Sequence, residues 1–327
     1  MPAIDPPFAR VAIRRFAHQR ITHTTPDTSG ATYFRPVTYT ERYAEIKGSE
    51  RGLRARVRHA ALDALALAQR MQGSTARALS RPRVQFLYIH HTFTDELVAL
   101  ERLVEALARD HTFIPYSEAV RRVQLGTMDR PYLCVSSDDG FRNNLDGARV
   151  LHRLGISACF FVNPALIGLK DPRHIRTICA ERFNLPPVRF LDRDELDELV
   201  KLGHEIGSHT WEHHHMDRLD HDHLVADIEK TRDTLIQWVG RADHFAFPYG
   251  RFTDFTAAGY RAVMAAGHLS CATAERGCHA NSTPTPPEEL LIRRDHIILD
   301  WPMPHIRYFL ASNALRGDAA SNPYLHA

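Results

Sequence analysis

The sequence predicts an α/β protein with a mostly parallel sheet or barrel, and three observations favour this class. From Val84 onward, short apolar runs alternate with longer amphipathic segments, as in chains where each strand is followed by a helix. Several of these runs end in polar, titratable side chains, which is where α/β folds place catalytic groups. A chain of 327 residues, 44% of them hydrophobic, has ample material for the buried core of such a sheet.

The N-terminal region differs from the rest of the chain. Residues 1–52 are polar and rich in Thr, Arg and Pro, and no fold is predicted for them. A helix is predicted over 53–71, because apolar residues recur there at helical spacing, with arginines near its start. This helix either packs on the main domain with a solvated basic face or contacts a membrane surface or an anionic partner. The stretch GSTARALSRPR, residues 73–83, is typical of a linker.

The remaining elements alternate along the chain. Apolar runs predict strands at 84–89, 112–114, 132–135, 158–162, 205–207, 245–247 and 269–272. Amphipathic spacing predicts helices at 97–107, 117–123, 145–154, 194–202, 221–239 and 255–266. Ser117 is the predicted N-cap of its helix. This order of strands and helices favours parallel pairing.

The composition excludes several functions. Lys plus Arg number 41 and Asp plus Glu 39, so the net charge gives no indication of a nucleic-acid partner. No apolar run reaches the ~18 residues that a membrane-spanning helix requires, and the N-terminus has no signal-like apolar core. An odd set of five cysteines indicates reduced, buried thiols, so we expect a cytoplasmic protein. Cys271, Cys278 and His279 would be an alternative metal site, although their spacing matches no zinc pattern.

Two adjacent carboxylates, Asp138 and Asp139, directly follow the predicted strand 132–135. Repulsion and desolvation oppose this placement, so a compensating partner is expected. Successive side chains of a strand point to opposite faces, so both can face one site only where the chain turns, which Gly140 permits. A cation between them would remove the repulsion. The alternative is a solvated Asp-Asp-Gly loop.

A histidine-rich segment supplies further ligand-type side chains. His209 and His213 are four residues apart, which on a helical turn places both rings on one side, as two ligands of a zinc-like ion require. His214 and His215 point elsewhere on such a helix and are predicted surface residues, although the spacing does not exclude His214 as a ligand. The segment lacks the H-E-x-x-H protease pattern, because position 208 is Ser.

Two other stretches end in groups that suit a binding site. The sequence HFAFPYGRF, residues 244–252, is an apolar run closed by Pro248-Tyr249-Gly250, which is expected to form a groove wall. The sequence VQFLYIHHTF, residues 84–93, is a predicted strand that ends in His90 and His91.

Together these motifs resemble the polysaccharide deacetylases of the NodB homology type, carbohydrate esterase family 4. The resemblance covers roughly residues 84–300 and rests on Asp138-Asp139-Gly140, His209 with His213, and Phe247 to Gly250. It implies a distorted (β/α) barrel of about seven strands, with residues 81–327 as the deacetylase domain and 1–80 as an N-terminal extension. It also implies one divalent metal, usually zinc.

The resemblance further implies roles for individual residues. Asp139, His209 and His213 would be the metal ligands, and Asp138 the general base. The Tyr249 backbone N–H would help to stabilise the oxyanion, with Pro248 and Gly250 beside it. For the general acid, His91 matches best and His90 is its close competitor, with His296 a weaker candidate.

The chain departs from the family pattern at two places. Ser136-Ser137 precedes the Asp pair instead of Thr-Phe, and Ala246 stands where an Arg often pairs with the base. Arg293 or Arg294 would supply that charge instead.

The expected function is metal-dependent removal of an N-acetyl group from an amino sugar. The substrate would be nucleotide-linked, lipid-linked or an oligosaccharide, as an intermediate of surface polysaccharide synthesis. Two alternatives stay open, which are a hydrolase of a formamide or another non-sugar amide, and a non-catalytic carbohydrate-binding relative. The sequence gives no indication of the oligomeric state.

Overall fold

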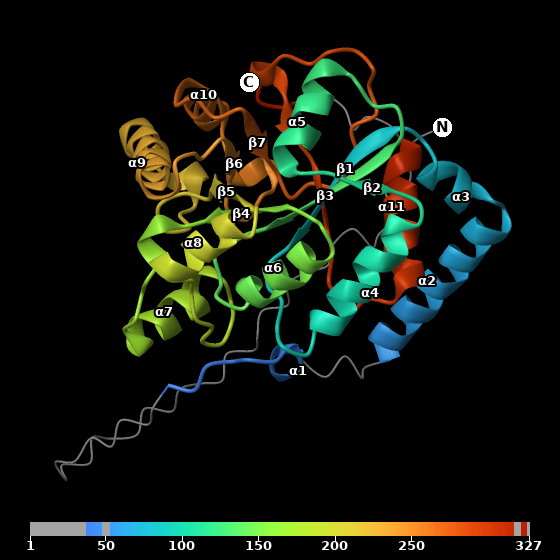
Figure 1. Ribbon diagram of the computed structural model, residues 1–327, viewed down its shortest axis with the longest axis horizontal. Coiled ribbons are helices and arrows are strands. Elements are labelled where there is room, and N and C mark those ends of the chain that lie inside the picture. Colours follow the sequence, from blue (N-terminus) through green and yellow to red (C-terminus); the bar gives the residue numbers. More distant parts are fainter. Residues whose placement is uncertain (1–36, 48–52, 317–321, 326–327) are drawn as a thin grey trace, which may run out of the picture. The chain divides into compact units, whose positions relative to one another are not determined.

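Nine parallel strands form one sheet at the centre of the part of the chain that the structure describes (Figure 1). This computed structural model describes residues 37–47, 53–316 and 322–325. Eight strands pair in the order β8-β7-β6-β5-β4-β3-β1-β9, and β2 pairs with β3 beside this path. The strands are β1 (Arg83–Ile89), β2 (Thr112–Phe113), β3 (Pro131–Ser137), β4 (Ala158–Val162), β5 (Glu205–Ser208), β6 (His244–Ala246), β7 (Ser270–Ala272), β8 (Leu291–Ile292) and β9 (Arg294–His296).

The sheet is rolled into a nearly closed barrel, as expected for a NodB-type fold. Its two edge strands, β8 and β9, are separated in sequence by Arg293 alone, so the chain itself joins the two edges. The sequence prediction of about seven strands did not include β8 and β9, which are two and three residues long. The two strands that close the barrel are therefore too short to show a strand pattern in the sequence.

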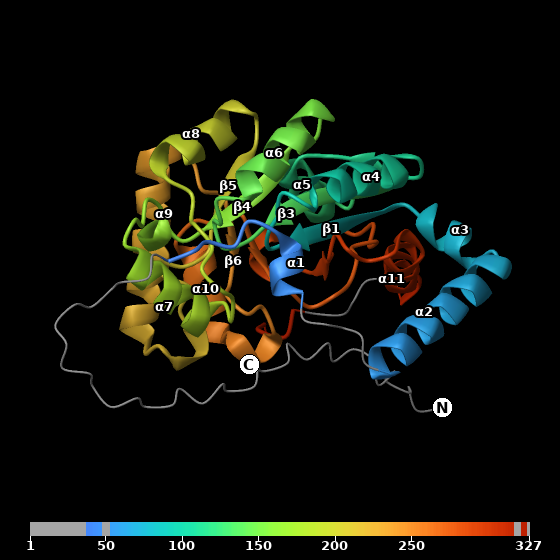
Figure 2. The same cartoon turned by 90° about the horizontal axis from the view of Figure 1, so that it is seen from below.

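The helices cover the outside of the sheet in the views of Figure 1 and Figure 2. They are α1 (Tyr43–Ile46), α2 (Leu53–Met71), α3 (Ser74–Leu79), α4 (Leu97–Ala108), α5 (Tyr116–Leu125), α6 (Asn144–Arg153), α7 (Pro172–Arg182), α8 (Arg193–Lys201), α9 (His221–Val239), α10 (Ala257–Ala265) and α11 (Met303–Arg316). Four 3-10 turns are η1 (Pro164–Leu166), η2 (Met216–Arg218), η3 (Phe252–Asp254) and η4 (Pro287–Glu289). The main apolar core lies between the sheet and α4, α6, α8 and α11.

Helix α2 spans the predicted residues and packs against α11 and α3. The predicted linker at 73–83 was wrong, because Ser74–Leu79 form α3, whose Ala78 and Leu79 are buried in the main core. Residues from Val37 onward belong to one compact unit, so α2 and α3 share it with the residues beyond the predicted boundary at 80.

Two further predictions concern Ser117 and the cysteines. Helix α5 begins at Tyr116 after Pro115, and the Ser117 side chain bonds Glu205 and His244 instead of capping the helix. All five cysteines are buried, and none of them forms a disulfide bond in the described part of the chain. Cys271 and Cys278 form no ligand cluster with His279 in the described ranges. Within the same ranges, no helix has the length and apolarity needed to cross a membrane.

Candidate active site

The two adjacent carboxylates lie at the carboxyl end of β3, in a turn. Asp139 itself has a left-handed backbone, with φ of 76°, and Gly140 follows with φ of 67°. This turn allows Asp138 and Asp139, both buried, to serve different partners. The expected departure from extended geometry is therefore present, and it begins at Asp139.

His209 and His213 are brought together by a turn after β5, and the predicted helical turn was wrong. Thr210 and His213 have left-handed backbones, with φ of 65° and 55°. The two rings lie 5.2 Å apart between centroids. Of the five non-glycine residues with positive φ in the described ranges, four lie in these loops: Asp139, Thr210, His213 and Tyr249. Such conformations cost about 1–3 kcal/mol each and cluster at functional sites.

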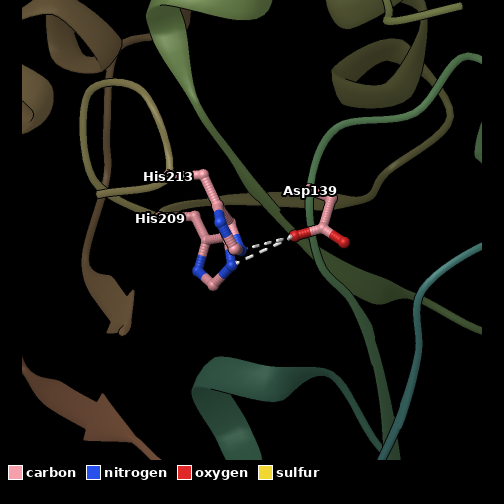
Figure 3. A group of neighbouring side chains, drawn as sticks. All are labelled: Asp139, His209 and His213. Atoms are coloured by element: carbon pink, nitrogen blue, oxygen red, sulfur yellow. Dashed lines mark ion pairs between the residues drawn. The ribbon is translucent and has the colours of Figure 1, made fainter. Parts of the chain in front are cut away.

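Asp139, from the turn after β3, and His209 and His213, from the loop after β5, form a buried cluster (Figure 3). The Nε2 atoms of His209 and His213 lie 3.3 and 3.4 Å from Asp139 Oδ1. One ligand atom from each residue lies within 4.8 Å of the other two. Among the described residues, this is the one group of at least three His, Cys, Asp or Glu side chains with such spacing.

The hydrogen bonds around this cluster indicate that it fits a cation. His209 Nδ1 donates to the Ala246 carbonyl at 2.7 Å, so its Nε2 carries a lone pair directed at Asp139. Asp139 Oδ1 is buried and has no hydrogen-bond partner. Acceptor atoms that converge without a proton between them repel one another, and a bound cation removes that repulsion. One carboxylate and two imidazoles are a donor set that suits Zn²⁺ with an open position.

The pKa shifts of Asp139 and His213 agree with this donor set. Burial alone would raise the pKa of Asp139, but the neighbouring His209 and His213 rings lower it to about 2. Burial lowers the pKa of His213 to about 3. Asp139 is thus anionic and His213 neutral at pH 7, which are the forms that ligate metals.

Asp138 is held by Arg294 in a buried, two-point ion pair. Arg294 donates from both terminal nitrogens to the two Asp138 oxygens, at 2.7 and 2.8 Å. Arg294 also donates to Ser136 Oγ at 3.3 Å. Ser136, one of the two serines that differ from the family pattern, is thus a hydrogen-bond partner of Arg294. Arg293 instead lies over the Phe252 ring. The charge missing at Ala246 is therefore supplied from β9.

His90 and His91 follow β1 but have different neighbours. His90 Nδ1 lies 3.2 Å from His296 Nε2, and burial lowers the pKa of His90 against the opposing charges of Asp139 and Asp138. His91 Nδ1 instead lies 3.3 Å from Glu96. The His91 ring packs on Phe93 and Tyr43, and none of its contacts in the described ranges is with the cluster. Of the two histidines, His90 is the one whose pKa is affected by the charges of Asp139 and Asp138, and the identity of the acid stays a prediction.

Pro248, Tyr249 and Gly250 follow β6 and lie beside the cluster. Tyr249 has a left-handed backbone with φ of 62°, and its ring lies 4.8 Å from the His213 ring. A Cβ on Gly250 would lie 2.4 Å from Ala274 Cβ, so only glycine fits there.

Two residues near this wall were missed by sequence reasoning. His215 was a predicted surface residue, but its half-buried ring stacks on Tyr249 at 3.8 Å and 11°. The Phe183 ring packs on the His213 ring with centroids 4.5 Å apart, a contact that no local sequence pattern indicates. His214 is not a ligand in this arrangement, because its Nδ1 pairs with Asp227 at 3.0 Å.

Comparisons with known proteins agree with this combination of barrel and site. Residues 126–264 match the sequence profile of the polysaccharide deacetylase family. Among curated protein sequences, none matches the chain. The match to this family profile confirms the resemblance seen in the sequence motifs over residues 126–264.

Solved structures share the fold. IcaB from Ammonifex degensii is 18% identical with a TM-score of 0.54, over 71% of this chain and 97% of that chain. The deacetylase PplD from Streptococcus pyogenes, solved with acetate, is 13% identical with a TM-score of 0.51, over 72% and 97%. The BpsB deacetylase domain from Bordetella bronchiseptica is 14% identical with a TM-score of 0.52, over 67% and 96%. At these identities the likeness shows the barrel architecture alone.

Proposed function

We propose that the protein is a metal-dependent hydrolase that removes an N-acetyl group from an amino sugar. The observation that carries this proposal is a buried three-ligand cluster beside a separate carboxylate, Asp138, that is held by Arg294. The match to the polysaccharide deacetylases supports the reaction class. A divalent cation held by Asp139, His209 and His213, for which we expect Zn²⁺, would polarise the amide carbonyl and acidify a water molecule.

Asp138 is the proposed general base. Its two oxygens accept from Arg294, which fixes the plane of the carboxylate next to the cluster. A carboxylate has about four acceptor sites, so Asp138 retains lone pairs that can take a proton from the attacking water. Asp139 is committed to the cluster, which explains why the chain carries two adjacent carboxylates.

His90 is the proposed general acid. Its Nδ1 is engaged by His296, which leaves Nε2 as the atom that gives a proton to the departing amine. The amide nitrogen can depart as a neutral amine only after it has gained a proton, so this reaction requires a positioned acid. The two imidazoles fix one another's orientation, and His296 in turn stacks on Tyr88 at 4.9 Å.

The Tyr249 backbone is the proposed oxyanion donor. No hydrogen bond engages its N–H within the described part of the chain, and its left-handed conformation turns this group out of the β6 direction. The Tyr249 ring, held by His215, forms the wall on which the sugar would pack.

The substrate that we propose carries an anionic group. Burial raises the pKa of the Tyr249 hydroxyl, and the charges of Arg182 and Arg218 oppose that rise. A nucleotide-linked or lipid-linked amino sugar would bring a phosphate charge toward these two arginines. We propose such an intermediate of surface polysaccharide synthesis, in the cytoplasm, where the five free thiols stay reduced.

The test uses purified protein loaded with Zn²⁺ and a substrate panel. The panel holds an N-acetyl amino sugar as an oligosaccharide and as a nucleotide conjugate, the N-formyl analogues, and a simple acetamide. We expect acetate release from the charged sugar, with Asp138→Asn retaining about one metal ion per chain and losing turnover. Asp217→Asn, an exposed carboxylate near the site, is the control and should remain active.

Three results would refute the assignment. Full activity of Asp138→Asn would show that the base is wrong, and release of formate alone would favour the formamide alternative. Absence of bound metal would favour a non-catalytic relative. The pairing of Arg294 with Asp138 opposes that last alternative, because the departure at Ala246 that favoured it is compensated.

A further inference from the structure

The outward face of α2 is apolar and exposed, which is unusual for a solvent-facing helix surface. The side chains of Val57, Leu67 and Met71 are 60%, 57% and 79% exposed. Ala60 and Ala64 lie exposed between them. Single exposed apolar residues need no explanation, whereas a continuous apolar stripe marks an interaction surface.

The spacing of this stripe is that of a helix pairing with another helix. Val57, Ala60, Ala64, Leu67 and Met71 are separated by three, four, three and four residues, an average of 3.5. Packing inside the chain does not account for it, because α2 contacts α11 and α3 through its opposite face. Figure 2 shows α11 between α2 and the sheet, so the stripe faces away from the barrel.

We propose that α2 pairs antiparallel with α2 of a second copy of this chain. In one register, Leu67 lies opposite the partner's Ala64, and Met71 lies opposite the partner's Ala60. Every layer between Ala60 and Met71 then joins one large and one small side chain, which keeps the two helix axes at an even separation.

Charge complementarity selects the same register. Asp63 and Arg70 flank the stripe on one side, seven residues apart. In the proposed register, Asp63 faces the partner's Arg70 and Arg70 faces the partner's Asp63, which gives two reciprocal ion pairs. The Asp63 side chain is 67% exposed, and its Oδ1 lies 2.7 Å from His305 Nε2, a contact that does not use Oδ2. Two-fold symmetry requires such reciprocity.

The neighbouring antiparallel register is disfavoured on both counts. A shift by one heptad places Val57 opposite the partner's Leu67 and Ala60 opposite the partner's Ala64, so two narrow layers lie between two wide ones. It also places Arg56 beside the partner's Arg70 and brings the two Asp63 side chains together. Like charges in these positions destabilise helix pairs.

A second helix suits this stripe better than a lipid surface does. Membrane-surface helices carry large apolar or aromatic side chains such as Trp, Phe and Leu on the buried face. Two of the five stripe residues are Ala, which contribute little to insertion but allow close approach of two helices. The overlap from Ala60 to Met71 is roughly 18 Å long, so the interface is small and the dimer should be weak, on the order of 10–100 µM in Kd.

The test is sedimentation equilibrium of the full chain up to about 200 µM, several times the expected Kd. We expect a monomer–dimer equilibrium that Leu67→Lys shifts to monomer, with at least a tenfold rise in Kd. The matched control is Val98→Lys, because Val98 on α4 is 58% exposed and Leu67 57%, and this variant should dimerise as the unmodified chain does. Arg70→Asp should weaken the dimer severalfold, whereas Arg77→Asp on α3 should not.

A cross-linking experiment tests the register. Chains carrying Ala64→Cys mixed with chains carrying Leu67→Cys should form a disulfide-linked heterodimer under mild oxidation, faster than Ala64→Cys mixed with Ala60→Cys. A monomer at every concentration, an unchanged dimer with Leu67→Lys, or preferential cross-linking of positions 60 and 64 would overturn the proposal. Binding of the monomer to anionic phospholipid vesicles through Leu67 would assign the stripe to a membrane surface instead.

Discussion

The two ends of the barrel both bury histidines and carboxylates, but they do so in different ways. At the amino ends of the strands, His244 opens β6 and lies between Ser117 and Ser270, at 2.9 Å from each hydroxyl. Glu205 opens β5 and accepts from the Ser117 backbone N–H at 3.1 Å. Each of these side chains has a protein partner, and each lies on a regular strand or helix.

At the carboxyl ends of the same strands, the polar groups lie on loops with left-handed residues. Asp139 Oδ1 and His213 Nδ1 are buried without hydrogen-bond partners. Asp139, His213 and Tyr249 have positive φ, which the surrounding structure must hold in place. A satisfied polar network stabilises the fold, whereas an unsatisfied, strained one marks the site where a ligand completes the structure.

Among the substitutions that test this difference between the two ends, loss of a cluster ligand should have the largest effect on activity. Asp139→Ala removes the one anionic ligand of the cluster, so we expect loss of bound metal and a fall in activity of at least about 10³-fold. Metal analysis and acetate release measure both. Glu205→Gln at the amino end is the matched carboxylate control. Should both variants keep their metal, the cluster would not be the metal site.

Substitution of each of the two neighbouring histidines after β1 tests which of them is the general acid. His90→Gln should lower kcat by about 10²–10⁴-fold at unchanged metal content, because the amine then lacks its proton donor. His91→Gln should change kcat by less than about threefold, because His91 pairs with Glu96. Reversal of these two results would restore the sequence-based preference for His91.

The Arg294 pair should couple the site to the stability of the barrel. Arg294→Met leaves Asp138 buried and unpaired, and should lower the free energy of unfolding by about 3–5 kcal/mol. Arg294→Lys keeps a charge but loses the two-point contact, and should lower kcat by about tenfold. Urea unfolding and steady-state kinetics measure these effects. The double variant Arg294→Met with Asp138→Asn should recover part of the stability, and additive losses would contradict direct coupling.

Substitution at the amino end should affect stability and leave catalysis unchanged. His244→Leu removes a partner from both serine hydroxyls and should lower the free energy of unfolding by about 1–3 kcal/mol. Its kcat at a temperature well below the melting point should match the unmodified protein. A large loss of kcat with unchanged stability would show that this end also takes part in the reaction.

Acid should destabilise the fold through two buried histidines outside the candidate site, His244 and His268. Burial lowers the pKa of His244 and of His268 to about 3, below the value of 6.5 that both have in the unfolded chain. Between pH 6.5 and about 3 the unfolded chain therefore binds more protons, so stability falls as the pH falls. Each histidine contributes up to about 1.4 kcal/mol per pH unit. His268→Leu should flatten the dependence measured by urea unfolding at pH 5 and pH 7, and an unchanged slope would contradict this assignment.

Much of the fold could be predicted because its signal is local. The strands β1, β3 and β4 are buried apolar runs, and α2, α6 and α9 have clear helical spacing. The strands β8 and β9 were missed because two or three residues are too few to show a period. Helix α3 was missed because Gly73 and Pro82 beside it are typical of linkers.

The site was predictable in residue identity but not in geometry. The motif positions of Asp139, His209 and His213 were available from the sequence, because their types and order are specific. The sequence did not predict which arginine pairs with Asp138, because that contact joins residues 156 positions apart and depends on how the barrel closes. The stacking of His215 on Tyr249 likewise depends on a loop conformation with no helical or strand period.

The position of Arg294 shows that a charge absent from a motif position can be supplied by another strand. A comparison limited to aligned positions would score Ala246 as a lost catalytic partner and class the chain as inactive. Here the positive charge comes from β9, at the seam where the sheet meets itself, while Ala246 offers its carbonyl to His209. A relative with alanine at this position should first be searched for an arginine on its last strand before its chemistry is discounted.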